Sequence, residues 1–192
     1  MTRVGGRRRR VAATLALAVA SLLTVAAEPT PAQPRTHVHG QATLRVVRDG
    51  NALGLELDAP LESLLGFERA PRTAAERTAL ASLQARLADP ARLFRLDAEA
   101  RCSITASAVA VPPLDAPPPR QAVGEGHADV AASVAFACLE PERLRVLDVR
   151  LFDDHPALMR IVVETVGIGR AAGPARRELR RGATAVPLGR AG

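Results

Sequence analysis

The sequence predicts an α+β fold: an antiparallel sheet built from β-hairpins, with one main helix packed on its apolar face. Several segments alternate apolar and polar residues between turn residues, which is typical of half-buried strands. Residues 73–88 instead space their apolar residues as a helix does. The chain has 192 residues, enough for one ordinary domain.

The positive charge of the chain is concentrated at its N-terminus. The net charge is +6, and five arginines lie within residues 1–10. An apolar stretch, residues 11–23, and a small-residue site ending at Ala27 follow, so residues 1–27 are predicted to be a cleaved signal peptide. An uncleaved anchor is the alternative. Without these five charges the net charge of the exported chain is 6 − 5 = +1. We therefore expect no nucleic-acid partner. After cleavage we also expect no membrane attachment.

The exported part divides into a Pro-rich linker, residues 28–36, and a single domain, residues 37–192. Its first strands are expected at residues 41–47 and 53–58, around an Asp49-Gly50 loop typical of hairpins. This loop brings apolar residues together on one face, in the pairs Val46–Leu53, Leu44–Leu55 and Ala42–Leu57.

The main helix is expected over residues 73–88. Thr73 and Glu76 have the spacing of a capping box. Asp89-Pro90 ends this helix and is expected to start a short second helical turn. The buried stripe of the main helix would be formed by Leu80, Leu83 and Leu87.

Residues 102–111 and 127–138 are expected to be antiparallel strands with Cys102 opposite Cys138. In an exported protein these two cysteines favour a disulfide, and two free buried thiols are the alternative. The bridge would close a loop of about 35 residues and stabilise the fold by roughly 4 kcal/mol. The same register predicts the pairs Ile104–Phe136, Ala106–Val134 and Ala110–Val130.

The remaining segments have weaker signals. They are predicted as a flexible Pro-rich loop (112–126), a helical turn (141–144), two strands (145–152 and 159–166) and a loosely ordered tail (167–192) with one strand near 184–188.

The best candidate for a functional site is His37-Val38-His39. Histidines at positions i and i+2 of a strand point to the same side, and Asp58 shares their polar hairpin face. Imidazole and carboxylate ligands suit Zn²⁺, and His127 lies on another polar strand face. A solvated histidine pair is the alternative.

The sequence contains no recognisable enzyme motif, neither a phosphate-binding loop nor a nucleophile elbow nor an HExxH zinc motif. Both cysteines are expected to face the core, away from any histidine. His155, which precedes Pro156 in a turn, is expected at the surface. We therefore do not expect an enzyme.

The chain resembles the ZrgA family of periplasmic zinc-uptake proteins over roughly residues 37–166. Cys102 and Cys138 lie in the matching part. The resemblance is carried, in family order, by residues 37–42 (HVHGQA), 55–60 (LELDAP), 65–73 (LGFERAPRT), 89–94 (DPARLF), 126–130 (GHADV) and 147–152 (LDVRLF).

The resemblance implies a periplasmic protein that binds zinc and assists its uptake, alongside a zinc importer that faces the periplasm. The implied metal-binding positions are His37, His39 and His127. The family usually has Glu-His where this chain has Glu68-Arg69. Glu68 then either remains a ligand or pairs with Arg69, whose positive charge stands where a cation would bind.

The family also usually has a loop rich in histidine and acidic residues between the two cysteine strands. Here that loop, residues 112–126, contains no histidine. The resemblance therefore implies one low-capacity zinc site. The alternative is an exported structural or interaction module of the same fold with a degenerate metal site.

Overall fold

The computed structural model of the chain describes residues 38–111, 129–168 and 173–189. All of them belong to one unit, Thr36–Gly192, and a second unit is Met1–Arg35. The predicted signal peptide, the linker and the 112–126 loop lie outside the described residues.

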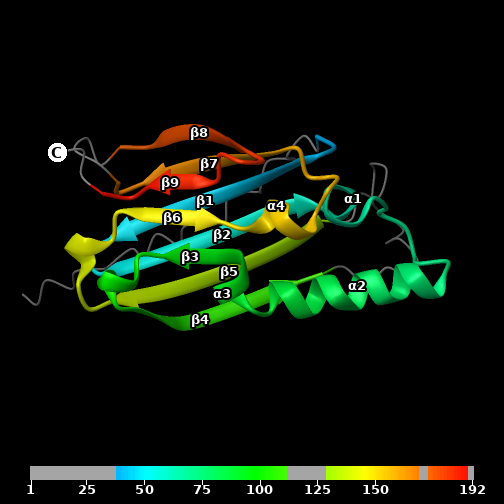
Figure 1. Cartoon of the computed structure of the whole chain (residues 1–192), viewed down its shortest axis with the longest axis horizontal. Coiled ribbons are helices and arrows are strands. Elements are labelled where there is room, and N and C mark those ends of the chain that lie inside the picture. The colour runs from blue at the N-terminus through cyan, green and yellow to red at the C-terminus, as the bar shows by residue number, and fades with distance from the viewer. Residues whose placement is uncertain (1–37, 112–128, 169–172, 190–192) are drawn as a thin grey trace, which may run out of the picture. The chain divides into compact units, whose positions relative to one another are not determined.

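Six strands form the larger sheet, in the order β4-β5-β2-β1-β7-β8 (Figure 1). Neighbouring strands are antiparallel except β1 and β7, which are parallel. The α+β class is confirmed, and this parallel pair makes the sheet mixed. The strands span Gln41–Asp49 (β1), Ala52–Pro60 (β2), Cys102–Ala110 (β4), Asp129–Cys138 (β5), Arg160–Val166 (β7) and Ala175–Arg180 (β8).

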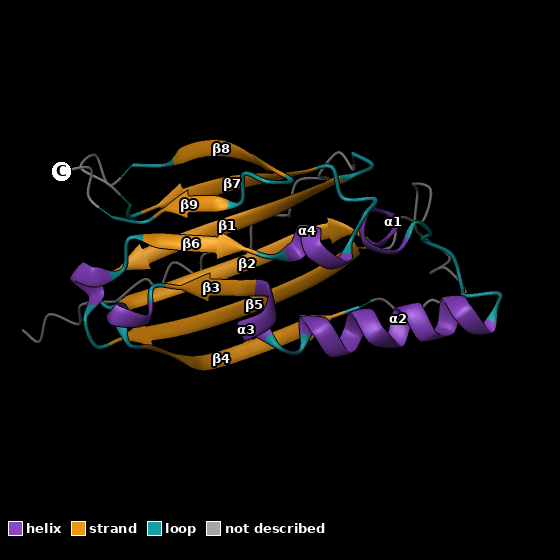
Figure 2. Cartoon of the chain, in the orientation of Figure 1, coloured by secondary structure: helices purple, strands orange, loops and turns teal. Residues whose placement is uncertain are grey.

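A second, three-stranded sheet covers much of the apolar face of the larger one. Its strands are β3 (Phe94–Leu96), β6 (Val146–Val149) and β9 (Ala185–Pro187), in the order β3-β6-β9. Figure 2 shows it in front of the larger sheet. One hydrophobic core includes residues of both sheets, among them Leu44, Val46, Leu55, Ile161, Phe94, Leu147, Val149 and Val186.

The helices complete this layer. The main helix, α2, spans Ala74–Leu87 with the predicted capping box of Thr73 and Glu76, and Asp89 leads into α3 as expected. Of the predicted stripe, Leu83 and Leu87 are fully buried, and Figure 1 shows α2 extending beyond the strand ends. The remaining helices are α1 (Leu61–Leu65), α3 (Pro90–Leu93), α4 (Leu151–Asp154) and the short 3₁₀ turns η1 (Ala98–Ala100) and η2 (Pro141–Arg143).

The first hairpin has the predicted strands but a different register. Asp49 pairs with Ala52, so the loop is Gly50-Asn51 rather than Asp49-Gly50. Gly50 takes the first loop position with φ of 56°, as glycine does in type II′ hairpins. Each partner therefore moves by two residues, and the pairs become Leu44–Leu57 and Val46–Leu55. Because side chains alternate with period two, the same residues still face the core.

The second predicted pair, β4 and β5, begins in the expected register, with Cys102 opposite Cys138 and Ile104 opposite Phe136. The predicted disulfide is present between the two cysteines. A β-bulge then leaves Thr105 without a partner across the pair, so Ala106 lies opposite Ala135 instead of Val134. The hydroxyl of Thr105 donates to the Ala135 carbonyl oxygen at 3.2 Å.

The predicted strand over residues 145–152 is wrong in its second half, where β6 ends at Val149 and α4 begins at Leu151. Leu151 and Phe152 are both buried at 1% exposure. Neighbouring residues of a strand point to opposite faces, whereas a helical turn lets both pack into one core.

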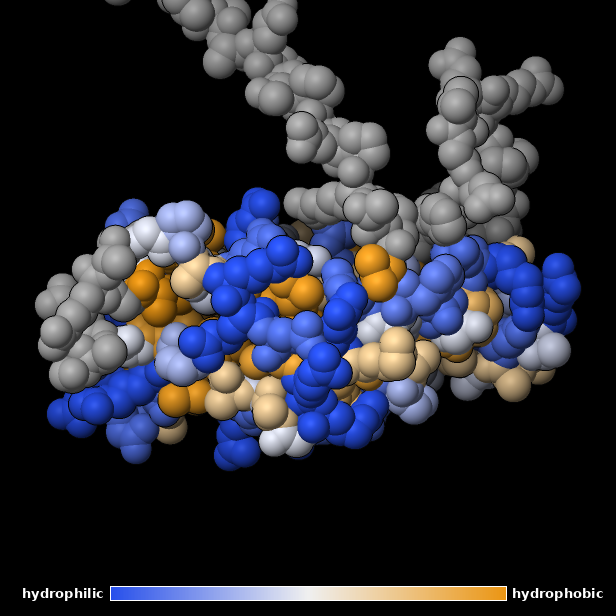
Figure 3. All heavy atoms as spheres, turned by 90° about the horizontal axis from the view of Figure 1, so that it is seen from above, coloured by the Kyte–Doolittle hydropathy of each residue, from blue (hydrophilic) through white to orange (hydrophobic). Residues whose placement is uncertain are grey.

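The tail contains more structure than the sequence indicates. β9 matches the strand expected near residues 184–188, and β8 is an additional strand that pairs with β7. All residues of β8 except Leu179 are exposed, and it carries Arg176, Arg177 and Arg180. Figure 3, which views the molecule from the β8 side, shows hydrophilic residues with hydrophobic ones between them. Such charges disfavour the pairing of an edge strand with another chain.

Arg48, at the end of β1, links the large sheet to the segments around the small one. Its Nη1 donates to the carbonyl oxygens of Leu188 at 2.8 Å and Leu144 at 3.2 Å, and its Nη2 donates to that of Pro141. These carbonyl groups flank β9 and β6, so one side chain ties both layers together.

Candidate metal centre

His39 lies just before β1, at the end of the sheet where β2 leads into α1. Its Nδ1 is 2.9 Å from Oε2 of Glu62 on α1, while its side chain remains 64% exposed. The hydrogen bond and the charge of Glu62 raise the pKa of His39, partial burial opposes them, and the charge of Glu68 adds to the increase. His39 is therefore an accessible imidazole close to two carboxylates.

The backbone next to His39 is held by the same helix. The Gly40 N–H donates to the Ser63 hydroxyl at 2.9 Å, and the Gly40 carbonyl oxygen accepts from the N–H groups of Met159 and Arg160 at 2.8 and 3.1 Å. Gly40 has a φ of 71°, a conformation that favours glycine. A side chain here would also put its Cβ 3.2 Å from the Ala157 carbonyl oxygen.

The two predicted carboxylate ligands, Asp58 and Glu68, lie on two other segments. Asp58 is a half-buried residue of β2, paired with Thr43 on one side and Ala131 on the other. Glu68 follows α1, which ends at Gly66 with a φ of 81°. Of these two carboxylates, Glu68 is the one whose charge raises the pKa of His39.

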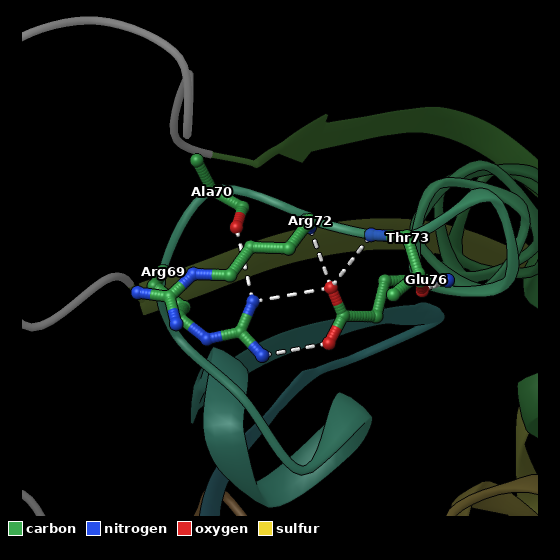
Figure 4. Close-up of polar contacts among 5 residues, drawn as sticks. All are labelled: Arg69, Ala70, Arg72, Thr73 and Glu76. Carbon is green, nitrogen blue, oxygen red and sulfur yellow. Dashed lines mark hydrogen bonds and ion pairs between the residues drawn. The ribbon is translucent and has the colours of Figure 1, made fainter.

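Arg69, at the position where the resemblance implies a histidine, binds the start of α2 (Figure 4). Its Nη2 is 2.7 Å from Oε1 of Glu76 and its Nη1 is 3.1 Å from Oε2, a two-pronged ion pair. The guanidinium also lies 5.4 Å from the centre of the Phe67 ring. The positive charge that the sequence places beside Glu68 is therefore balanced by Glu76.

The ion pair adds to the capping box. Oε2 of Glu76 also accepts from the backbone N–H groups of Arg72 and Thr73 at 2.5 and 3.2 Å. Arg69 and these N–H groups lower the pKa of Glu76 to about 2. The same carboxylate thus caps α2 and binds Arg69.

The other predicted ligands, His37 and His127, lie outside the described residues. Their nearest described neighbours in sequence are Val38 and Asp129, and Asp129 pairs with Pro60, directly before α1. Within residues 38–111, 129–168 and 173–189, no three His, Cys, Asp or Glu side chains are grouped closely enough to hold a metal ion. The complete ligand set therefore stays a prediction.

His155 was expected at the surface, and this is wrong, because it is only 1% exposed. Its Nδ1 is 2.9 Å from the Leu64 carbonyl oxygen, and its own carbonyl oxygen accepts from Nη2 of Arg181 at 3.2 Å. Burial lowers the pKa of His155, as does Arg86, while Leu64 and Asp154 oppose the decrease. Packing by segments distant in sequence buries this turn, so His155 is a core residue.

The comparison with protein families identifies the chain. The model of the ZrgA family of zinc uptake proteins matches residues 36–188. The chain belongs to the ZrgA family. A search of curated proteins found no significant match.

The ZrgA match includes every predicted ligand and both cysteines, and it ends just beyond β9. The name of the family, which describes zinc uptake proteins, relates the chain to zinc. None of the described helices is both long enough and apolar enough to cross a membrane.

Sequence reasoning missed Glu62, the residue that binds His39. The two are 23 positions apart, and their contact depends on α1 folding back beside the start of β1. Glu62 shares no strand face or motif with the histidines, so only the tertiary structure brings them together.

Proposed function

We propose that this ZrgA-family protein is a periplasmic zinc-binding protein that assists zinc uptake rather than an enzyme. The observation that carries the proposal is the imidazole of His39, which is open to solvent, bound by Glu62 and close to the charge of Glu68. Neutral imidazole and carboxylate oxygen are the ligand types that bind Zn²⁺.

Chain connectivity supports a site at this end of the sheet. His37 is one residue from Val38, and His127 is two residues from Asp129, whose partner Pro60 leads into α1. We propose that His37, His39 and His127 are the ligands, with Glu68 and Asp58 as the carboxylates available to complete the coordination. Zinc is then the cargo, to be passed to an importer that faces the periplasm.

The disulfide agrees with export, because such bonds persist in oxidising compartments. It supports the periplasmic location independently of the N-terminal sequence, which has the pattern of a signal peptide.

Competition with a chromophoric chelator at pH 7.5 tests the proposal. We expect the purified protein to bind one zinc ion per chain, and the His37→Ala/His39→Ala double variant to lose this binding. Glu178→Gln is the control for a changed surface charge, because Glu178 is not a predicted ligand, pairs with the side chains of Arg180 and Arg160, and is 35% exposed. Equal binding by the wild type and the double variant would contradict the ligand assignment.

Lowering the pH provides a second arm of this test. Protons and zinc compete for imidazole nitrogen, and Glu62 raises the pKa of His39 above its ordinary value of 6.5. Zinc affinity should therefore begin to fall above pH 6.5 as the solution is acidified. Affinity that stays constant down to pH 5 would indicate a carboxylate-only site.

An exported interaction module with a degenerate site is the second candidate. It is favoured by the absence of a three-ligand group among the described residues and by Arg69 at the family's histidine position. Such a protein would unfold at the same temperature with zinc or with chelator, whereas a ligand specific to the folded state raises that temperature.

A further inference from the structure

From the contacts of α1 we infer that Glu62 is a positioning residue for zinc, fixing the His39 ring so that its Nε2 faces the incoming ion. The inference rests on the proposed function and adds a residue that neither the zinc-site prediction nor the family match assigns. Glu62 acts through His39 and is not itself a ligand in this arrangement.

The contact with Glu62 determines which ring nitrogen of His39 is free to bind a metal. Nδ1 of His39 is 2.9 Å from a carboxylate oxygen of Glu62. An ionised carboxylate only accepts hydrogen bonds, so Nδ1 carries the proton and donates it. In the neutral ring the lone pair then lies on Nε2. Histidines that bind metals commonly use this arrangement, with a carboxylate holding the other N–H.

The ring of His39 and the backbone beside it are held by several hydrogen bonds. Glu62 and Ser63 are neighbours on α1: one holds the His39 ring and the other, fully buried, binds the Gly40 N–H. The Gly40 carbonyl oxygen accepts hydrogen bonds from the N–H groups of Met159 and Arg160, which belong to a different segment. The His39 ring and the Gly40 backbone are thus held by α1 and by the segment that leads into β7. A precise ligand geometry needs such support.

Glu62 and His39 differ in their exposure to solvent. The Glu62 side chain is 30% exposed, whereas that of His39 is 64% exposed. The carboxylate is therefore partly enclosed by the fold while the ring stays open to an arriving ion. Glu68 contributes a second negative charge near the ring, which favours a cation at this position.

The test compares the zinc affinity of the wild type with that of Glu62→Ala and Glu62→Gln, using Glu178→Gln as the matched carboxylate control. We expect Glu62→Ala to bind zinc about 10- to 100-fold more weakly, as is typical when such a partner of a metal-binding histidine is lost. Glu62→Gln keeps the size of the side chain and should fall between Glu62→Ala and the wild type. Glu178→Gln should match the wild type.

A second readout separates positioning from a general effect on the fold. Nitrogen chemical shifts of the His39 ring in the zinc-free protein at pH 8.5 should show the proton on Nδ1 in the wild type. In Glu62→Ala the tautomer protonated at Nε2 should become populated. A structural role alone would change the unfolding temperature without changing the tautomer.

Two outcomes distinguish the two levels of the proposal. If the wild type binds zinc and Glu62→Ala binds it equally well with an unchanged tautomer, the role of Glu62 is overturned and zinc binding stands. If the wild type binds no zinc, the proposed function is overturned, and the positioning role with it.

Discussion

The guanidinium of Arg69 contacts both carboxylate oxygens of Glu76, at 2.7 and 3.1 Å, where the chain enters α2. Arg69 stands where the resemblance to the ZrgA family implies a histidine, and it has a structural partner of its own. The replacement removes a candidate ligand and strengthens a helix cap, and the two effects can be measured separately.

Arg69→His should restore an imidazole beside Glu68 and bind zinc more tightly than the wild type. The same variant should unfold at a lower temperature, because Glu76 loses its ion pair with Arg69. Isothermal titration and thermal unfolding measure the two effects. Arg69→Gln is the control: it should lose stability similarly but gain no affinity. Equal zinc affinity for both variants would show that position 69 lies outside the site.

The stability of the fold should decrease on mild acidification because of His155. Burial lowers the pKa of His155 in the folded state, so the unfolded chain, with a pKa near 6.5, binds the proton more readily. The penalty is absent above about pH 6.5 and grows as the pH falls toward the folded-state pKa.

His155→Asn keeps a donor near the Leu64 carbonyl oxygen and removes the titration. We expect urea midpoints measured between pH 7.5 and 5 to fall less for this variant than for the wild type. His39 has the opposite effect on stability, because its pKa is raised in the folded state and its protonation therefore stabilises the fold at low pH. Parallel pH profiles for His155→Asn and the wild type would contradict the assignment to His155.

The disulfide between Cys102 and Cys138 should contribute roughly 4 kcal/mol through the loop that it closes. It joins the edge strand β4 to β5 beside the core. Urea unfolding with and without a reductant should show this loss in the wild type. The Cys102→Ser/Cys138→Ser variant should have the lower stability under both conditions. If full reduction left the stability of the wild type unchanged, the disulfide would make no such contribution.

Gly40→Ala should destabilise the fold and weaken zinc binding together. Its φ of 71° costs a non-glycine residue about 1–2 kcal/mol, and the new Cβ would meet the Ala157 carbonyl oxygen. Gly182→Ala is the matched control, since its φ is 82° with open space around it. Denaturant unfolding and zinc titration of both variants should show that only Gly40→Ala affects affinity. Equal zinc affinities of Gly40→Ala and Gly182→Ala would show that the Gly40 backbone does not contribute to the zinc site.

Local sequence patterns predicted the elements whose signals lie within a few residues of each other. The capping box of Thr73 and Glu76 places α2, and the cysteine register starts β4 and β5 correctly. The hairpin loop was misplaced because Asp49-Gly50 and Gly50-Asn51 are both good loop dipeptides, and both keep the apolar face inward.

The parts that could not be predicted depend on contacts between distant segments. The parallel pairing of β1 with β7 and the covering sheet leave no short motif in the sequence. The same is true of the candidate site, where alternation grouped His39 with Asp58 but could not find Glu62. His155 followed a turn pattern typical of the surface and was buried by packing that no local pattern encodes.

The parallel pairing of β1 and β7 also determines when the chain can finish folding. Gln41 pairs with Arg160, and the core includes Val186 and Leu188, near the end of the chain. Such distant pairings make folding slow, on the order of milliseconds to seconds. A chain that emerges N-terminus first therefore cannot complete this pairing or this core until almost all of its residues are available.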